Sequence, residues 1–108
     1  MRIIYVGAAC LWLSGCAAST VYRQPGAPVL PASVPAGVRI FGGEPRGAYT
    51  VLGSVAADKI GAAADALELL REKAASLGAD AVIDVRLTKI DVASGRTGLS
   101  GTAVRLGR

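Results

Sequence analysis

The chain has 108 residues, enough for one small domain, and it carries 12 Lys and Arg against 8 Asp and Glu. A net charge of +4 is too mild to indicate nucleic-acid binding. The chain has no histidine, which excludes Ser-His-Asp triads and histidine acid–base chemistry and argues against most enzyme classes. We therefore expect a non-enzymatic protein with no catalytic residue.

The amino-terminal residues have the form of a lipoprotein signal peptide. Arg2 precedes an apolar run that is shorter than the about 20 residues needed to span a bilayer. The run closes on a small-residue motif and a cysteine: Leu13, Ser14, Gly15 and Cys16. This motif resembles a lipobox, so we expect residues 1–15 to be cleaved and Cys16 to carry the lipid anchor. The alternative is a cysteine that merely ends an ordinary secretory signal or a short membrane stub.

The predicted processing also limits what the cysteines can do. Cys10 lies within the signal peptide and Cys16 would carry lipid, so the mature chain would have no thiol for a disulfide, a metal cluster or nucleophilic catalysis. Because histidine is absent as well, we expect no Cys/His metal site and no cofactor.

Residues 16–37 are predicted to form a tether rich in proline and alanine. Its prolines are spaced so that we expect no helix or sheet ladder to persist: Pro25, Pro28, Pro31 and Pro35. Proline-rich chain tends to polyproline II at about 3.1 Å per residue, so the tether could hold a domain as far as ~60 Å from the lipid. We therefore expect the domain to stand clear of the membrane.

The folded domain is predicted over residues 38–108. Residues 38–41 and 49–55 are rich in β-forming side chains and flank a glycine-rich turn, so we expect a hairpin. Residues 62–77 carry apolar side chains at i, i+3 and i+4 spacing, which predicts an amphipathic helix. Gly78 follows directly and can take the left-handed conformation that ends a helix.

Two further strands are predicted after the helix. In residues 81–88 apolar and polar side chains alternate, and the expected core face consists of Ala81, Ile83, Val85 and Leu87. Residues 101–106 form the last strand. The order ββαββ predicts an α+β fold, a small and mainly antiparallel four-stranded sheet with one helix packed on one face. So small a core favours a homo-oligomer or a partner that covers the sheet edges.

The junction between helix and strand resembles known families. Residues 70–83, LREKAASLGADAVI, and residues 101–104 are similar to the YbjQ family of bacterial domains, which is named for heavy-metal binding, and to envelope lipoproteins related to the Rcs stress sensor RcsF. The resemblance implies the fold over residues 38–106. It does not carry over the disulfide-held sensor role or a heavy-metal site, because the mature chain lacks the cysteines and histidines that these need. Asp80 and Asp84 are expected about 13 Å apart, too far to share one ion.

Two function classes remain after these exclusions. The first is a lipid-anchored envelope protein that acts through periplasmic protein contacts, as a sensor, assembly accessory or spacer. Its partners would be the membrane and either an envelope protein or a second copy of the chain. The alternative is an oligomeric small-ligand or metal-binding module of YbjQ type, with a site between subunits. Because Ala17 rather than aspartate follows Cys16, the resemblance to envelope lipoproteins implies an outer-membrane address facing the periplasm.

The candidate partner surface is the solvent side of the last hairpin. It carries most of the carboxy-terminal charge, on Arg86, Lys89, Arg96 and Arg105. A solvated sheet face explains these residues equally well.

Overall fold

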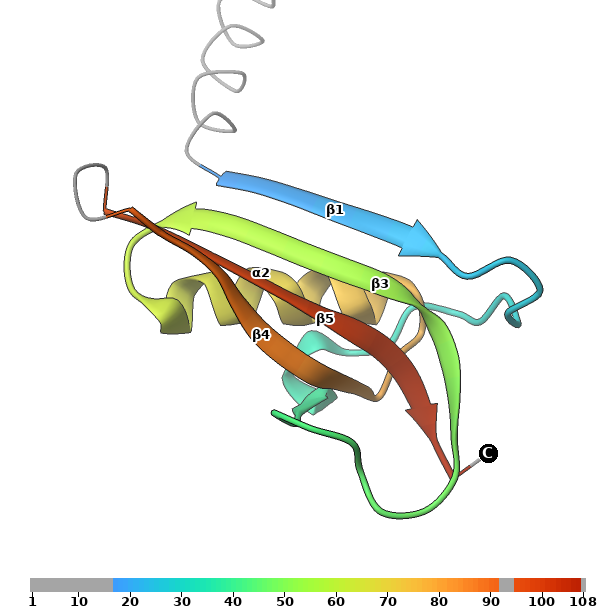
Figure 1. Cartoon of the computed structure of the whole chain (residues 1–108). Coiled ribbons are helices and arrows are strands. Elements are labelled where there is room, and N and C mark those ends of the chain that lie inside the picture. The colour runs from blue at the N-terminus through green and yellow to red at the C-terminus, as the bar shows by residue number, and fades with distance from the viewer. Residues whose placement is uncertain (1–16, 92–94, 108) are drawn as a thin grey trace, which may run out of the picture.

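The structure, a computed structural model, describes residues 17–91 and 95–107 as a five-stranded sheet with one α-helix on one face (Figure 1). Strands β1, β3, β5, β4 and β2 lie in that order, with β2 and β4 parallel and the other neighbours antiparallel. The α+β class and the covering helix are confirmed, and the expected four strands are corrected to five in a mixed sheet. The elements are β1 (Ala17–Arg23), the short 3-10 helix η1 (Pro35–Gly37), β2 (Arg39–Ile40), β3 (Tyr49–Ile60), α2 (Ala63–Ser76), β4 (Ala81–Asp91) and β5 (Arg96–Leu106).

Helix α2 forms where the sequence predicts it. Asp65 in its first turn accepts a hydrogen bond from the Ala62 backbone N–H at 3.1 Å, which satisfies one of the donors left free at a helix start. After its last turn Gly78 has φ +82°, the left-handed conformation expected there. The buried stripe of the helix consists of Ala66, Leu70, Ala74 and Ala75.

The main core lies between α2 and the sheet. Its buried sheet residues come from the three central strands: Leu52, Val55, Ala57, Val82, Leu99 and Ala103. A second, smaller cluster lies apart from it, with Ala81, Ile83 and Val104 buried and Phe41, Tyr49 and Leu106 packed against them. Strands β4 and β5 therefore contribute apolar side chains to both clusters.

The hairpin expected between residues 38–41 and 49–55 does not form. Strand β2 instead pairs in parallel with the start of β4, where Arg39 N–H donates to the Asp80 carbonyl and Phe41 N–H donates to the Val82 carbonyl. Strand β3 has no free edge to offer, because β1 and β5 occupy both of its sides. The available edge of β4 therefore takes β2.

A β-bulge corrects the expected alternation in β4. The register with β5 shifts between Ile83 and Arg86, and Asp84 within the shift has φ +56°. The extra residue reverses which side chains face the helix, so Val82 and Val85 pack with the helix-side core while Ile83 belongs to the second cluster. The predicted single core face of β4 is therefore split between the two faces.

Strand β1 corrects the expectation that no sheet ladder forms before residue 38. It pairs with β3 over its full length, from Ala17 opposite Lys59 to Arg23 opposite Gly53. The described side chains of its first half, in residues 18–20, are exposed, so main-chain hydrogen bonds hold it rather than a buried apolar stripe. The prolines that suggested a tether all lie after β1.

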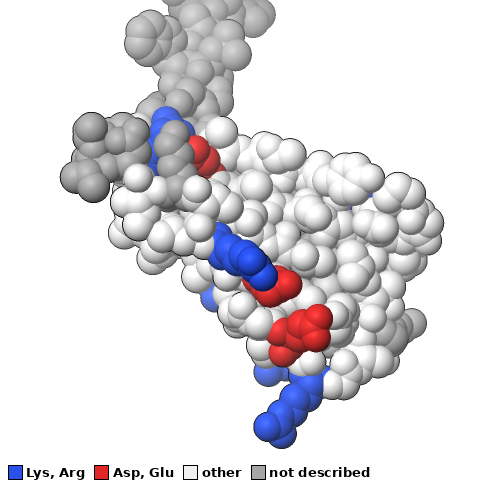
Figure 2. Space-filling view, viewed as in Figure 1, with Lys and Arg blue, Asp and Glu red and all other residues white. Residues whose placement is uncertain are grey.

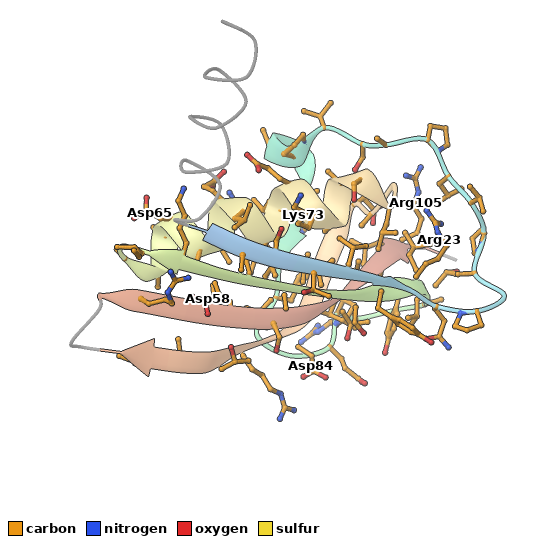
Figure 3. The ribbon with its side chains drawn as sticks, turned by 90° about the horizontal axis from the view of Figure 1, so that it is seen from above. Arg23, Asp58, Asp65, Lys73, Asp84 and Arg105 are labelled. Atoms are coloured by element: carbon orange, nitrogen blue, oxygen red, sulfur yellow. The ribbon has the colours of Figure 1, made fainter. Side chains whose placement is uncertain are left out.

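Residues 24–34, here called the strap, continue from β1 across to the helix side of the sheet (Figures 1 and 3). Ser33 N–H donates to the Ala75 carbonyl at 2.9 Å, and the Ser33 hydroxyl donates to the Ala79 carbonyl. Leu30 packs against the main core. These contacts fix the strap on the domain, where the sequence predicted an extended tether. No helix within residues 17–91 and 95–107 is both long and apolar enough to cross a bilayer.

Candidate functional site

The sheet face that α2 leaves uncovered, here called the open face, is hollowed into a shallow trough of about 350 Å³. Four neighbouring strands contribute to it. Its lining includes Thr20 and Tyr22 of β1, Ser54 and Ala56 of β3, Ser100 and Thr102 of β5, and Asp84 and Arg86 of β4. Figure 2 shows this face, with a mostly uncharged centre and a row of charged side chains along one side.

The trough exists because alternate residues of its central strands have small side chains. Ser54 pairs with Tyr22 on one side and with Thr102 on the other, so this rung carries two small hydroxyl side chains beside one aromatic. Tyr22 is 56% exposed. Ligand pockets usually bury most of a small molecule, whereas this trough is open and shallow. Its shape therefore suits contact with another macromolecular surface.

The charged rim of the trough is set by the β4 bulge. Arg86 and Asp84 lie 3.7 Å apart as an exposed ion pair. The loop after β2 docks beside them, because Asp84 N–H donates to the Gly43 carbonyl and Val85 N–H donates to the Phe41 carbonyl. A bulge and a left-handed non-glycine residue re-aim side chains in this way at many functional sites.

Tyr49 lies near this rim and is electrostatically coupled to it. Its hydroxyl donates to Glu44 Oε1 at 3.3 Å. Partial desolvation raises the pKa of Tyr49 above its ordinary value, and the negative charges of Glu44 and Asp84 raise it further. The phenol is therefore held neutral over a wider pH range than in a free tyrosine.

The structure does not bring the four predicted basic residues into one patch. Arg86 is on the open face, whereas Arg105 is on the helix side, where it donates to the Gly78 carbonyl at 3.1 Å and lies 3.8 Å from Asp80 (Figure 3). Arg96 pairs with Asp58 at 3.1 Å. Lys89 pairs through its backbone with Gly98, and its side chain lies outside the described part of the structure.

The remaining predicted site residues, Leu13, Ser14, Gly15 and Cys16, also lie outside the described residues. Sequence reasoning missed the trough itself. Thr20 and Tyr22 stood in the expected tether, and Ser54 and Thr102 are ordinary strand residues. The available signal was the alternation of small polar side chains along β3 and β5. This pattern indicates a trough only once β1 is known to lie beside β3.

Comparison with known proteins assigns the domain to a family. Residues 35–107 match the family model YbjQ_1, which is described as "Putative heavy-metal-binding". The chain belongs to this family. The resemblance to YbjQ domains is thereby confirmed, while the likeness to envelope lipoproteins stays a prediction. No curated protein matches the chain.

One solved structure shares the fold. The crystal structure of a Francisella virulence factor, FvfA, in an orthorhombic form is similar with a TM-score of 0.56 and 18% sequence identity. The match covers 81% of this chain and 96% of that one. At this identity the likeness shows the fold alone. The family match starts at residue 35, so β1 and the strap lie before the matched region of this YbjQ domain.

The donors of this YbjQ domain do not fit the heavy metal that the family description names. Soft metals are held by thiolate and imidazole groups, and the chain has no histidine and only Cys10 and Cys16, both outside the described residues. In the part of the chain that the structure describes, no three His, Cys, Asp or Glu side chains are grouped closely enough to hold one ion. Asp80 accepts a hydrogen bond from Leu106 N–H at 2.8 Å, and Asp84 pairs with Arg86.

Proposed function

We propose that this protein is a non-enzymatic, lipid-anchored protein of the cell envelope that binds a partner protein through the open face of its sheet. The observation that carries the proposal is the trough, which is wide and shallow and is lined by small hydroxyl side chains from β1, β3 and β5 and by a charged pair from β4. Tyr22 and Arg86 both line it. Tyrosine and arginine are enriched among the residues that dominate binding energy at protein interfaces.

The anchor in this proposal is Cys16, and the address is the outer membrane. The lipobox-like motif and Ala17 at the position after the cysteine support both parts. Intact mass of the membrane-extracted protein should show a chain that starts at residue 16 and carries lipid, and Cys16→Ser should abolish the modification. An unmodified wild-type protein would contradict the anchor.

The address can be tested without disturbing the fold. Ala17 lies opposite Lys59 in the ladder, so an Ala17→Asp variant would place a carboxylate across from an ammonium group, which a sheet tolerates well. We expect the wild type to fractionate with the outer membrane and Ala17→Asp to shift toward the inner membrane. A wild type found with the inner membrane would contradict the address.

The partner contact can be tested by photo-crosslinking in whole cells. A crosslinking amino acid at Thr102, inside the trough, should capture a distinct envelope protein, whereas the same group at the exposed Glu72 of α2 should not. The adduct from position 102 should be lost when Tyr22→Ser and Arg86→Ser are added, because both changes remove side chains from the trough. Equal adducts from positions 102 and 72, or none from position 102, would contradict the proposal.

A second candidate function is an oligomeric ligand- or metal-binding module, which the family description favours. In such a module, the carboxylates of Glu44 and Asp84 would bind a metal ion together with oxygen ligands from other copies of the chain. Native mass spectrometry of the lipidated protein, with and without added divalent metal, separates the two. A metal-dependent ring favours the second candidate, and a monomer without bound metal favours the first.

A further inference from the structure

The start of β1, the end of β3 and the adjoining ends of β4 and β5 lie together at one end of the sheet (Figure 1). The register places four residues on one rung across these strands. Ala17 pairs with Lys59, Lys59 with Thr97, and Thr97 with Ile90. Neighbouring strands are about 4.8 Å apart, so the rung extends ~15 Å from the first residue of β1 to Ile90.

This end carries two exposed isoleucines. Ile60 follows Lys59 in β3 and is 49% exposed, and Ile90 is 65% exposed. Ile60 pairs with Arg96 and Ile90 with Thr97, which are consecutive in β5, so the two side chains lie on opposite faces of the sheet at its end. Exposed apolar side chains are unfavourable in water, so both would gain by contact with an apolar phase or another protein.

The position of the lipid anchor favours the membrane over another protein as the surface that this end contacts. Cys16 is bonded directly to Ala17, and consecutive Cα atoms are about 3.8 Å apart. Ala17 is already locked in the ladder, and the strap is bound to α2, so no free chain separates the lipidated cysteine from the folded domain. A lipid on Cys16 therefore brings the rung to the bilayer surface.

We propose that this end of the domain, here called the membrane-facing end, lies on the bilayer that holds the anchor, with Ile60 and Ile90 in contact with the lipid interface. The inference rests on the proposed lipid anchor and adds an orientation to it. Each isoleucine gains by leaving water, since burial of apolar area stabilises by about 25 cal/mol per Å². Lys59 on the same rung can direct its ammonium group to anionic headgroups.

Charge plays a minor part in this contact. Arg96 at the same end is paired with Asp58 at 3.1 Å, and Asp65 lies in the first turn of α2, which begins nearby. Cationic and anionic groups are therefore mixed around the rung. The two isoleucines and the anchor drive the contact, and we expect it to persist when salt is raised.

The orientation has a consequence for the open face. The four strands that end on the rung extend away from the bilayer, so the trough is turned sideways rather than toward the lipid (Figure 1). A partner that is itself held in the same membrane could then reach Tyr22 and Thr102.

The test uses the full-length, lipidated protein reconstituted in vesicles of phosphatidylethanolamine and phosphatidylglycerol. Ile90→Cys introduces the one reactive thiol of the mature chain, because Cys10 is removed with the signal peptide and Cys16 is blocked by lipid. A polarity-sensitive fluorophore is attached there and challenged with lipids that carry a quencher. Val29→Cys, at an exposed apolar residue of the strap, is the matched control.

We expect blue-shifted emission and several-fold stronger quenching at position 90 than at position 29, at low and at high salt. Ile60→Cys should repeat the result of position 90 from β3, on the other side of β5. Equal quenching at positions 90 and 29, in protein whose mass shows the lipid, would overturn the orientation and leave the anchor intact. Protein without lipid by mass, or absent from the vesicles, would overturn the proposed anchor itself.

Discussion

Helix α2 and strand β1 both lie against β3, yet different forces hold them. The helix presents four buried side chains to the sheet, with Leu70 fully inaccessible, so apolar burial stabilises it. Strand β1 has exposed side chains in its first half and is held by its ladder with β3. An element held by side chains is visible in a single sequence, whereas one held by main-chain hydrogen bonds carries almost no residue pattern.

The largest effect is expected from the helix. Leu70→Ala leaves a cavity in the main core and should lower the free energy of unfolding by about 2–5 kcal/mol. Urea denaturation followed by circular dichroism measures it. Leu87→Ala is the control, since Leu87 is 52% exposed and its truncation should change stability by no more than about 0.5 kcal/mol. Equal losses in both variants would mean that the helix is not docked through Leu70.

The next largest effect is expected where the end of α2 meets the strap that follows β1. Gly78 and Gly47 have similar φ values of +82° and +86°, so alanine at either position costs about 1–2 kcal/mol in backbone strain. A Cβ at residue 78 would also lie 2.6 Å from Leu30 Cβ and 2.7 Å from the Pro31 carbonyl oxygen, whereas residue 47 has open space. Gly78→Ala should therefore lower the thermal midpoint more than Gly47→Ala and expose the Ser33 amide to hydrogen exchange. Identical behaviour would show that the strap is not packed on α2.

A smaller and more local effect is expected at β1. A side chain on Gly53 would collide with the Tyr22 carbonyl oxygen, so Gly53→Ala should displace β1 and leave α2 in place. Hydrogen exchange should show lost protection in residues 18–23 and retained protection in the helix. Gly43→Ala meets open space and should leave both unchanged. Loss of protection throughout the domain would mean that β1 is essential for the fold.

The smallest effect concerns Tyr49 at the rim. The pKa of Tyr49 is raised above the ordinary 10.0, so the folded state binds its proton more tightly than the unfolded state does. The resulting stabilisation is present below pH 10 and is lost as the pH rises through the folded-state pKa. Absorbance of the phenolate, compared with Tyr49→Phe, follows the ionisation. Glu44→Gln should lower the midpoint only in part, because desolvation remains.

The parts of the fold that the sequence predicted are those with a strong local period. Leu70 and Ala74 repeat at helical spacing, and Gly78 has the conformation that its position after the helix requires. The α+β class follows from these residues and the flanking strands. The pairing of β2 could not be predicted, because two residues have no register signal and the choice depended on which strand edge stayed free.

The candidate site was predictable only in fragments. Arg86 was singled out for its charge, and it does line the trough, but Tyr22 and Thr20 were assigned to the tether because of the prolines that follow them. The trough depends on four strands that are distant in sequence. Arg105 lies on the opposite face of β5 from Thr102, which places it on the helix side. Only the register shows that it can donate to the Gly78 carbonyl there.

Because Asp84 is an extra residue in β4, the arrangement of this strand depends more on its number of residues than on which residues they are. Side chains in a strand alternate with a period of two, so Arg86 and Leu87 keep their faces only while that residue is present. Deleting Asp84 would invert the pleat up to the second register shift after Leu87, turning Arg86 toward the helix and Leu87 toward the trough. A substitution at one of these positions alters one contact, whereas this deletion would move several side chains of β4 to the opposite face of the sheet at once.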